Sequence, residues 1–369
     1  MSPLREIAAL FLRLGTTAFG GPAAHIAMME DEVVARRKWV TREELLDLIG
    51  ATNLIPGPNS TELAIHLGYR RAGWRGLVVA GVCFILPAAL LVTLLAWAYV
   101  RYGSLPEASS ALRGIKPVVI AIVAQALWRL GRSAMKSPLL AAVGAVAFAA
   151  VALGVHELAV LGAAGALMAA TKLRGAPPAA LLLPLVPVGA PAAAAATFSL
   201  GSLFLVFLKI GTVLFGSGYV LFAFFRTELV ERLHWLTEAQ VIDAIAIGQV
   251  TPGPVFTSAT FVGYLLGDLG GAAVATAGIF LPAFVFVALS GPLVPWLRKH
   301  AAAGAFLDGL NVASLALMAL VSLQLARGTF VDVPSVVLAL AAAGALALRI
   351  NSVWLVLGGA VAGLVPSFV

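Results

Sequence analysis

Long uninterrupted apolar blocks are the feature that most constrains the fold of this chain. Four of them, 76–100, 199–225, 270–296 and 301–326, each reach the roughly 20 residues that a helix needs to cross a hydrocarbon core of about 30 Å. Hydrophobic residues make up 61% of the chain and charged residues 11%, against about 45–50% and about 25% in soluble domains. The sequence therefore predicts an integral protein of the lipid bilayer.

Charge and cysteine content exclude several function classes. The net charge is +7, but the basic residues sit in short loops between apolar blocks, as the positive-inside rule expects, so we expect no nucleic-acid partner. The single cysteine, Cys83, and five scattered histidines offer no disulfide and no paired metal ligands. Phosphate-loop and dinucleotide motifs are absent. We therefore expect no cofactor, no metal site and no enzymatic activity.

The chain repeats itself. Segment 4–89 matches segment 200–284, first with an offset of 196 that pairs Trp39 with Trp235 and Pro56-Gly57-Pro58 with Pro252-Gly253-Pro254. One residue is then lost in the second copy and the offset becomes 195. Such coincidences of Gly, Pro and Trp in one register indicate homologous halves. We predict an N-terminal repeat over 1–174, an Ala/Pro-rich linker over 175–198 and a C-terminal repeat over 199–369.

Loop charge predicts that the two copies insert in opposite orientations. Basic residues flank the first Pro-Gly-Pro motif on both sides, whereas the matching second-copy loops carry fewer cations and added acids. By the positive-inside rule, the first copy's loops face the cytoplasm and the second copy's face outward. Both ends of stretch 44–68 then lie on one side, which predicts a re-entrant hairpin broken at Pro-Gly-Pro, with 239–263 as its inverted partner.

The predicted fold class is an all-α polytopic membrane protein. It contains two inverted-topology repeats, each with about five transmembrane helices plus one re-entrant broken-helix hairpin. Three cations, Arg101, Arg113 and Lys116, fall outside and disagree with this topology. If 181–197 crossed the membrane, the halves would instead be parallel.

Glycine and proline breaks in both copies are the first indication of a site. The first helix of each half is interrupted at 19–22 and at 215–218, and the hairpins are interrupted at their Pro-Gly-Pro motifs. Each restarted helix exposes amide N–H groups and the positive end of its dipole, which favours anions. The alternative is that these residues merely permit kinks and close packing.

Matched polar residues inside apolar segments are the second indication. Arg13 and Lys209 occupy equivalent positions, and each either attracts an anionic substrate or snorkels to an interface. Glu62 is a candidate partner for Arg13 and a candidate proton carrier. Asn53 and Gln249 either bind substrate or cap the broken helices.

The matched acids are assigned to salt bridges or helix caps near loop edges. They are Glu32 with Glu228 and Asp47 with Asp243. His25 and His66 are weaker proton-carrier candidates, since a histidine at a helix end is more often structural.

The complete candidate site follows from these two indications. The substrate-binding candidates are Arg13, Gly20, Gly21, Pro22, Asn53, Pro56, Gly57, Pro58, Asn59, Ser60, Thr61, Lys209, Gly216, Ser217, Gly218, Gln249, Pro252, Gly253, Pro254 and Thr257, with Glu62 as the proton-coupling candidate.

These motifs resemble the chromate ion transporter family, whose long members are two fused homologous domains. The resemblance is carried by Phe19-Gly20-Gly21-Pro22, by Pro56-Gly57-Pro58-Asn59 and by their second-half echoes. It implies proton-driven chromate export across the inner membrane of a prokaryote, and chromate resistance. The second copy departs from the pattern at 217–218 and 255–256, which indicates that the first half carries more of the polar site.

Other functions stay open from the residues alone. Sulfate and chromate are both tetrahedral dianions, so the physical argument stops at a small oxyanion. A channel lined by helix dipoles would lack saturable, proton-linked flux. A membrane-bound chromate reductase would need flavin, haem or iron–sulfur ligands, which the motifs do not supply. A homodimer is one candidate assembly.

Overall fold

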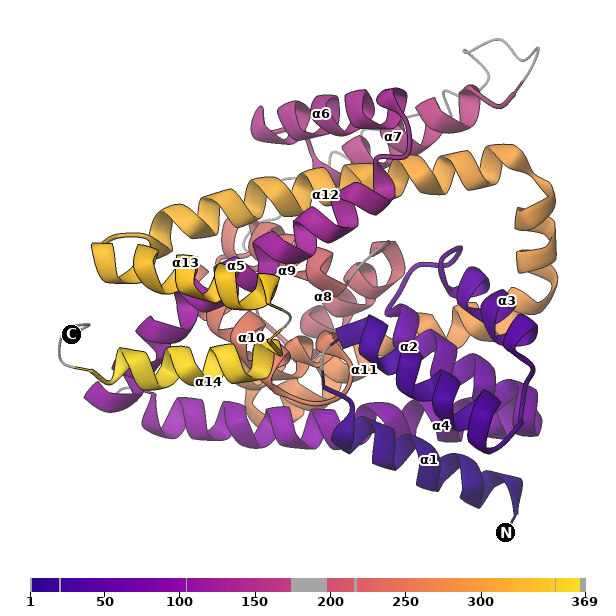
Figure 1. Cartoon of the computed structure of the whole chain (residues 1–369), viewed down its shortest axis with the longest axis horizontal. Coiled ribbons are helices and arrows are strands. Elements are labelled where there is room, and N and C mark those ends of the chain that lie inside the picture. The colour runs from indigo at the N-terminus through magenta and orange to yellow at the C-terminus, as the bar shows by residue number, and fades with distance from the viewer. Residues whose placement is uncertain are drawn as a thin grey trace.

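The computed structural model describes residues 2–19, 21–103, 105–173, 198–215, 218–348 and 350–365, and every regular element among them is helical (Figure 1). The elements of the first half are α1 (Pro3–Thr17), α2 (Gly21–Glu30), the π-helix η1 (Asp31–Arg36), α3 (Arg42–Thr52), α4 (Asn59–Tyr102), α5 (Pro106–Ala134), α6 (Pro138–Ala152) and α7 (Glu157–Ala170). Those of the second half are α8 (Leu200–Val213), η3 (Gly218–Val220), α9 (Leu221–Phe224), the π-helix η4 (Phe225–Arg232), α10 (Glu238–Val250), η5 (Val255–Thr257), α11 (Ser258–Lys299), α12 (Ala301–Thr329), α13 (Val333–Ala347) and α14 (Ser352–Gly363).

The helices of the two halves follow the same order, and the second half has two additional short 3₁₀ turns, η3 and η5. Helices α5 and α12 are both 29 residues long and begin 195 positions apart. Helix α4 leaves helical geometry at Ala72–Gly73, and α11 does so at the equivalent Gly267–Asp268. The internal register therefore continues beyond the segments whose sequences match most strongly. The predicted linker, 175–198, lies outside the described residues except for Phe198.

Helix length divides the elements into long and short. Among the described residues, four helices are long and apolar enough to cross a membrane: α4, α5, the 255–290 stretch containing most of α11, and α12. The shorter apolar helices α6, α7, α8, α13 and α14 have 12 to 15 residues, or about 18–22 Å at 1.5 Å per residue. In the described part of the chain, fewer helices are long enough to cross a membrane than the five expected in each half.

The first helix of each half folds back at its predicted break. Helix α1 ends at Thr17 and α2 begins at Gly21, yet Arg13 forms a 2.5 Å ion pair with Glu32. If the two helices continued in line, these residues would lie almost 30 Å apart at 1.5 Å per residue. An equivalent ion pair joins Lys209 to Glu228 in the second half. Each break is thus the tip of a two-helix hairpin.

A second hairpin follows in each half at Pro-Gly-Pro. In the first half it joins α3, of 11 residues, to residues 59–71, which form the first segment of α4. Its base is closed by an ion pair of 2.7 Å between Glu44 and Arg70. Neither arm reaches the roughly 30 Å of a hydrocarbon core. The ends of the predicted stretch therefore meet, as a hairpin requires.

Helix α4 turns back again after this hairpin. At Gly73 the backbone has φ of +59°, a left-handed value that glycine adopts without steric cost. Gly68 and Gly76, on the two sides of the turn, pack backbone to backbone and leave no room for a Cβ atom. Gly263 and Gly271 repeat this packing in α11. The longer segment of α4 then runs the length of the molecule (Figure 1).

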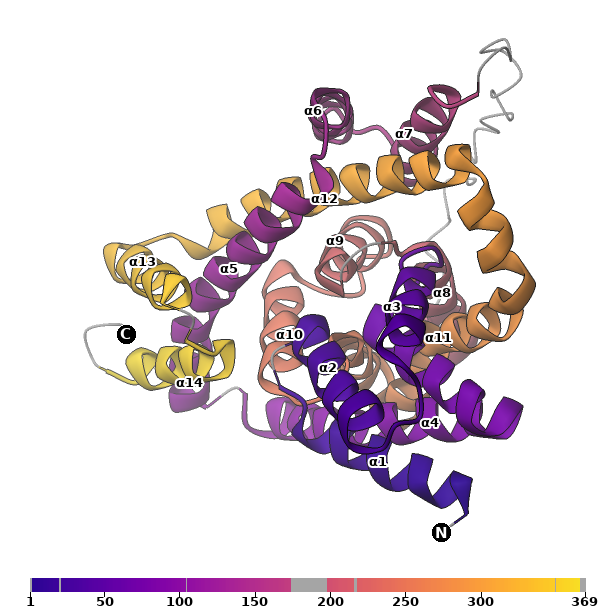
Figure 2. The same cartoon turned by 45° about the vertical axis from the view of Figure 1, so that its right-hand side comes forward.

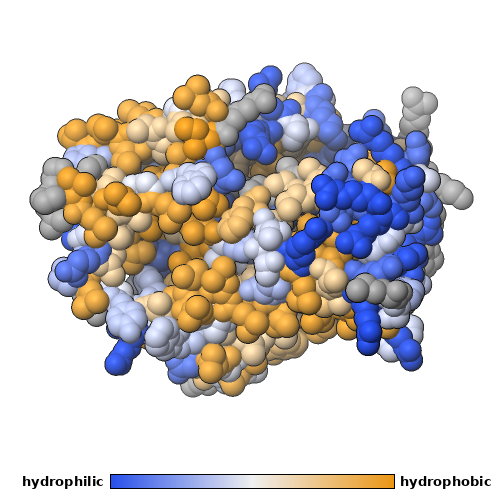
Figure 3. All heavy atoms as spheres, turned by 60° about the horizontal axis from the view of Figure 1, so that its bottom comes forward, coloured by the Kyte–Doolittle hydropathy of each residue, from blue (hydrophilic) through white to orange (hydrophobic). Residues whose placement is uncertain are grey.

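The surface is polarised along the long axis. Figure 3 shows hydrophilic residues gathered at the end that holds the N-terminus and α3, while hydrophobic residues cover the middle. The turn from α11 into α12 lies at the same end in both ribbon views (Figures 1 and 2). Lys136 also lies there, because it forms an ion pair of 2.9 Å with Asp308 near the start of α12. We call this the basic end, because the cationic first-copy loops lie here.

Candidate functional site

The hairpin tips of the two halves bind each other through their backbones. The amide of Gly57 donates to the carbonyl of Leu214 at the end of α8, at 2.9 Å. Reciprocally, the amide of Gly253 donates to the carbonyl of Ala18 at the end of α1, at 2.9 Å. Each Pro-Gly-Pro tip thus contacts the helix break of the opposite half. The structure therefore brings the two Pro-Gly-Pro tips against the ends of α1 and α8, which precede the other two predicted breaks.

Both central glycines have conformations that require glycine. Gly57 has φ of +139° and Gly253 has φ of +85°, where a Cβ atom is strongly disfavoured. A Cβ on Gly57 would collide with the Glu62 carboxyl, and one on Gly253 would lie 2.7 Å from the Cβ of Ala88. The tips are therefore close-packed, and Glu62 lies directly against the first one.

A cavity of about 570 Å³ adjoins the first-half tip. It is lined by Thr52, Asn53, Leu54, Ile55, Asn59, Leu130, Ser133, Ala134, Lys136, Val220, Gly304, Leu307, Asp308, Asn311, Ser314 and Leu315. These residues come from the Pro-Gly-Pro hairpin, from the end of α5, from the start of the α9 region and from the first half of α12. The cavity reaches from the basic end, where Lys136 lies, to the hairpin tip.

The polar lining of this cavity consists of side-chain amides, hydroxyls and one Lys–Asp pair. The hydroxyls of Thr52 and Ser133 donate to their own helix backbone, at 2.9 and 2.8 Å. The amide nitrogen of Asn59 donates to the Asn53 side-chain oxygen at 2.7 Å, which holds the two amides together. The only carboxylate among its lining residues, Asp308, is paired with Lys136. The hydroxyl of Ser314 is buried and has no hydrogen-bond partner among the described residues. Such a lining suits an oxygen-rich anion, since N–H and O–H groups compensate its lost hydration.

The start of α4 is the most polar part of the tips. His25 lies 3.2 Å from the Ser60 hydroxyl and 3.0 Å from the Ala18 carbonyl oxygen, so it links the break of α1 to the start of α4. Thr61 and Glu62 are fully buried. Neither the Thr61 hydroxyl nor either Glu62 oxygen has a hydrogen-bond partner among the described residues. A buried carboxyl without a partner is costly, and its presence at the tip indicates a function.

The start of α11 is less polar. Thr257 donates to the Pro254 carbonyl at 2.7 Å and Ser258 to the Val255 carbonyl at 2.9 Å, so both hydroxyls are bound by their own backbone. Gln249 is buried at the position equivalent to Asn53. Gly218, also buried, faces the Phe256 ring. The predicted imbalance between the two copies is visible in these contacts.

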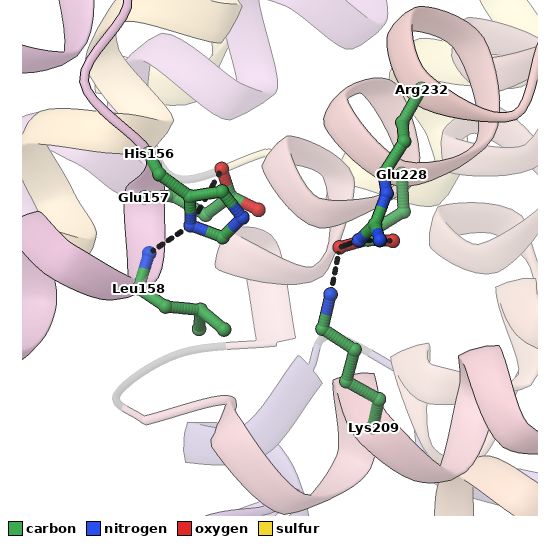
Figure 4. A network of polar contacts seen from close by, with 6 residues as sticks. All are labelled: His156, Glu157, Leu158, Lys209, Glu228 and Arg232. Carbon is green, nitrogen blue, oxygen red and sulfur yellow. Dashed lines mark hydrogen bonds and ion pairs between the residues drawn. The ribbon is translucent and has the colours of Figure 1, made fainter. Parts of the chain in front are cut away.

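The predicted cations lie elsewhere. Arg13 pairs with Glu32 rather than with Glu62, and Arg37 also reaches Glu32 at 3.1 Å. Lys209 pairs with Glu228, which is 2% exposed (Figure 4). Each pair joins the two arms of a hairpin, and neither cation lines the 570 Å³ cavity. The assignment of Glu32 and Glu228 to salt bridges is thus confirmed, although both carboxylates are buried rather than at loop edges.

The remaining candidates divide by position. Gly21, with φ of +75°, and Pro22 begin α2, and Pro56, Pro58, Pro252 and Pro254 flank the tip glycines. Gly20, Gly216 and Ser217 lie outside the described residues. The structure therefore brings the Pro-Gly-Pro and helix-start candidates together with the two asparagines, and separates Arg13 and Lys209 from them.

Sequence reasoning missed the far wall of the cavity. Ser133 lies in the last turn of α5 and Lys136 follows that helix, whereas Asp308, Asn311 and Ser314 lie in α12. A signal was present, because Asp308 and Asn311 interrupt a block long enough to span a membrane, where polar residues tend to be functional. The repeat drew attention to the recurring motifs and to the residues beside them, and the far-wall residues lie away from these motifs.

The long apolar helices define a class of protein, a multi-pass membrane protein. A sequence profile described as "Chromate transporter" matches residues 5–170 and again residues 201–364. The chain belongs to the chromate transporter family. The two matched parts fall on the two halves whose helices follow the same order.

Individual relatives agree with the profile. The chain is 34% identical over 375 residues to a chromate transport protein of Cupriavidus metallidurans, covering 98% of this chain and 93% of that one. It is 32% identical to a chromate transport protein of Pseudomonas aeruginosa, covering 97% and 91%. It is 31% identical to a probable chromate transport protein of Synechococcus elongatus, covering 92% and 88%. No solved structure matches the chain.

Proposed function

We propose that this protein is a secondary active transporter that exports chromate across the cytoplasmic membrane, coupled to the proton gradient, and so confers chromate resistance. The observation that carries the proposal is the cavity of about 570 Å³ at the first Pro-Gly-Pro tip, whose lining includes three asparagine amides and the Ser314 hydroxyl. Relatives similar over nearly their whole length are named for chromate transport. The cavity opens from the basic end, which the positive-inside rule assigns to the cytoplasm.

The cavity offers what a tetrahedral dianion needs. Its amides and hydroxyls come from several elements, among them Asn53, Asn59, Asn311 and Ser314. The start of α4, where N–H groups and the positive dipole end face outward, lies at its inner end. A weak site built from neutral donors and a dipole binds and releases its anion, as transport requires.

The proposal includes two inverted repeats meeting at the membrane midplane. Two observations support it: the reciprocal hydrogen bonds of Gly57 and Gly253, and half-length hairpins whose tips meet those of the other half. Substrate sites between inverted repeats with discontinuous helices are the recurring plan of secondary transporters.

Within this plan, the substrate is held by the tip residues and the two asparagines. Arg13 and Lys209 act at a distance, through the hairpins that they hold closed.

Glu62 is the proposed proton-coupling group. It is buried, its oxygens have no hydrogen-bond partner among the described residues, and it lies against Gly57 at the tip. Protonation would remove its charge without requiring another group to move. The proposed cycle binds a proton here in one orientation and releases it in the other.

A second candidate substrate is sulfate or another small tetrahedral oxyanion. The donor set described above does not distinguish dianions of similar size and shape. Discrimination requires contacts that one anion makes and the other cannot.

Flux measurements test the proposal. Purified protein in inverted vesicles should accumulate chromate in a saturable manner, faster when the vesicle interior is acidified. Excess sulfate should compete weakly. Flux that is linear in chromate concentration would instead indicate a channel. Equal or better transport of sulfate would replace the substrate while keeping the architecture.

A further inference from the structure

A buried ionic cluster connects the second half's Pro-Gly-Pro hairpin to the first half. Asp243 of α10 forms an ion pair with Lys116 of α5 at 3.6 Å. It also accepts a hydrogen bond of 2.8 Å from the hydroxyl of Tyr99, near the end of α4. Asp243 is 2% exposed. This Lys116–Asp243–Tyr99 cluster therefore joins three elements, two from the first half and one from the second.

The internal repeat gives the cluster a counterpart in the open cavity. Helices α5 and α12 are offset by 195, so Lys116 corresponds to Asn311. Asn311 lines the 570 Å³ cavity. Asp243 corresponds to Asp47 of α3, with the offset of 196. In each copy, a Pro-Gly-Pro hairpin faces the long helix of the other half. The cavity separates α3 from α12, whereas an ion pair joins α10 to α5.

Chemistry explains which of the two clefts is open. Lys116 carries a charge that Asp243 neutralises, and Tyr99 fixes the carboxylate from the other side. The Tyr99 ring is itself held edge-on to Phe261 of α11, with centroids 5.1 Å apart. Asn311 is uncharged and cannot form an ion pair with α3. In a low-dielectric interior an ion pair between two elements resists separation strongly.

We propose that the Lys116–Asp243–Tyr99 cluster is the closed gate of the end opposite the basic end. In this inference, which rests on the transport function proposed above, opening that end requires Lys116 to part from Asp243. The cavity at the basic end then closes as its counterpart opens. The cluster also explains why Lys116, a cation on the wrong side by the positive-inside rule, is retained in α5: it serves a buried acid rather than a loop.

Two matched cysteine reporters test the gate. Ala134 lines the open cavity at the end of α5, and Thr329 is its equivalent at the end of α12, where it is buried. Ala134→Cys and Thr329→Cys would each be placed in a Cys83→Ala background. A membrane-impermeant maleimide is then applied from each side of sealed vesicles. Without a gate mutation, Ala134→Cys should react from the basic end and Thr329→Cys should stay protected from the opposite end.

Gate mutations should reverse this pattern. Lys116→Asn introduces the residue of the open copy, and Asp243→Asn removes the acid. Each should raise labelling of Thr329→Cys from the opposite end at least about fivefold and lower that of Ala134→Cys. Lys116→Arg, which keeps the charge, should retain protection. Protection of Thr329→Cys that survives both gate mutations would overturn the proposal. So would increased labelling of both reporters together, which marks local unfolding rather than a switch.

The labelling needs no substrate, so it separates this inference from the transport proposal. If the wild-type protein transports no chromate while the reporters switch, the gate stands and the function falls. If chromate flux is normal in the wild type and the reporters do not switch, the gate alone falls.

Discussion

The two Pro-Gly-Pro tips make the same backbone contact and carry different side chains. Both central glycines have positive φ, and both donate to the carbonyl that ends the first helix of the other half. The first tip carries a histidine–serine contact and a buried carboxyl without a hydrogen-bond partner among the described residues, whereas the second tip's hydroxyls bind their own backbone. The shared backbone hydrogen bond indicates what the architecture requires of both tips. The differing side chains indicate which tip performs the chemistry.

The largest expected effect is at the glycine that both tips share. Gly57→Leu should abolish chromate flux, because its side chain must occupy the space of the Glu62 carboxyl while adopting a φ of +139°. Gly253→Leu, the matched change, should also abolish flux, because its backbone role is the same. Flux would be measured in vesicles at equal amounts of folded protein, judged by size-exclusion chromatography. An active, folded Gly57→Leu variant would show that the first tip is not at the site.

Glu62 tests the side-chain difference. Glu62→Gln keeps the shape of the carboxyl and cannot release a proton, so chromate accumulation driven by a proton gradient should fall at least tenfold. Exchange of chromate across the membrane without a gradient should persist. Ser258→Ala, a change at the start of α11 in the second half, is the control and should leave both near wild type. Normal gradient-driven accumulation by Glu62→Gln would remove Glu62 from the coupling step.

Substitutions of Asn53 and Gln249 test whether the two tips contribute unequally to chromate binding. Asn53→Asp places a negative charge at the cavity and should raise the half-saturating chromate concentration about tenfold, which corresponds to about 1.4 kcal/mol. Gln249→Glu should raise it less, because Gln249 lies at the tip that the cavity does not reach. Equal effects of the two changes would mean that the tips bind the anion equivalently. The measurement is the concentration dependence of flux at fixed pH.

Much of the architecture was predictable because its motifs recur in the two halves of the sequence. The Pro-Gly-Pro motifs and the breaks near residues 20 and 216 stand out when the copies are aligned, and the structure places helix ends at both. Fold-back of α1 on α2 was not predicted. A break in a helix does not reveal the angle after it, and that angle is fixed here by ion pairs such as Arg13–Glu32.

The site was predictable only beside the motifs that recur. Asn53 and Asn59 line the cavity as expected, but Lys136, Asp308 and Asn311 come from a distant wall. Which wall faces the tip depends on helix packing across the halves, and the sequence does not encode that in any local pattern. Lys116 shows the same limit, because its disagreement with the topology has a cause, the pairing with Asp243, that only the tertiary contact reveals.

The ion pairs that join the two arms of the first hairpin in each half, Arg13–Glu32 and Lys209–Glu228, extend the comparison to stability. Lys209→Ala should lower the unfolding free energy more than Arg13→Ala, by a difference on the order of 1 kcal/mol. Glu32 keeps Arg36 and Arg37 when Arg13 is lost, whereas Glu228 keeps only Arg232 among its ion-pair partners in the described part of the chain. Thermal unfolding in detergent, with both variants at one protein concentration, measures the order. A larger loss for Arg13→Ala would show that the spare arginines do not compensate.

The smallest effect concerns the base of the first hairpin at acid pH. The Thr41 amide and the Arg70 guanidinium hold the pKa of Glu44 below its ordinary value of 4.5. A carboxyl with a lowered pKa in the folded state contributes stability above its unfolded pKa and loses it as the pH falls through the folded one. In the second half the equivalent residue is Gln240, whose side-chain oxygen accepts from the Thr237 amide at 2.9 Å and so caps α10 without a charge. Glu44→Gln therefore reproduces the second copy and supplies a control. Wild type should unfold at a slightly higher temperature than Glu44→Gln near neutral pH. The difference should shrink as the pH falls below the ordinary pKa of 4.5 and disappear once the pH lies below the lowered pKa of the folded state. A difference that persists in acid would show that Glu44 stabilises the hairpin by packing or capping rather than by its charge.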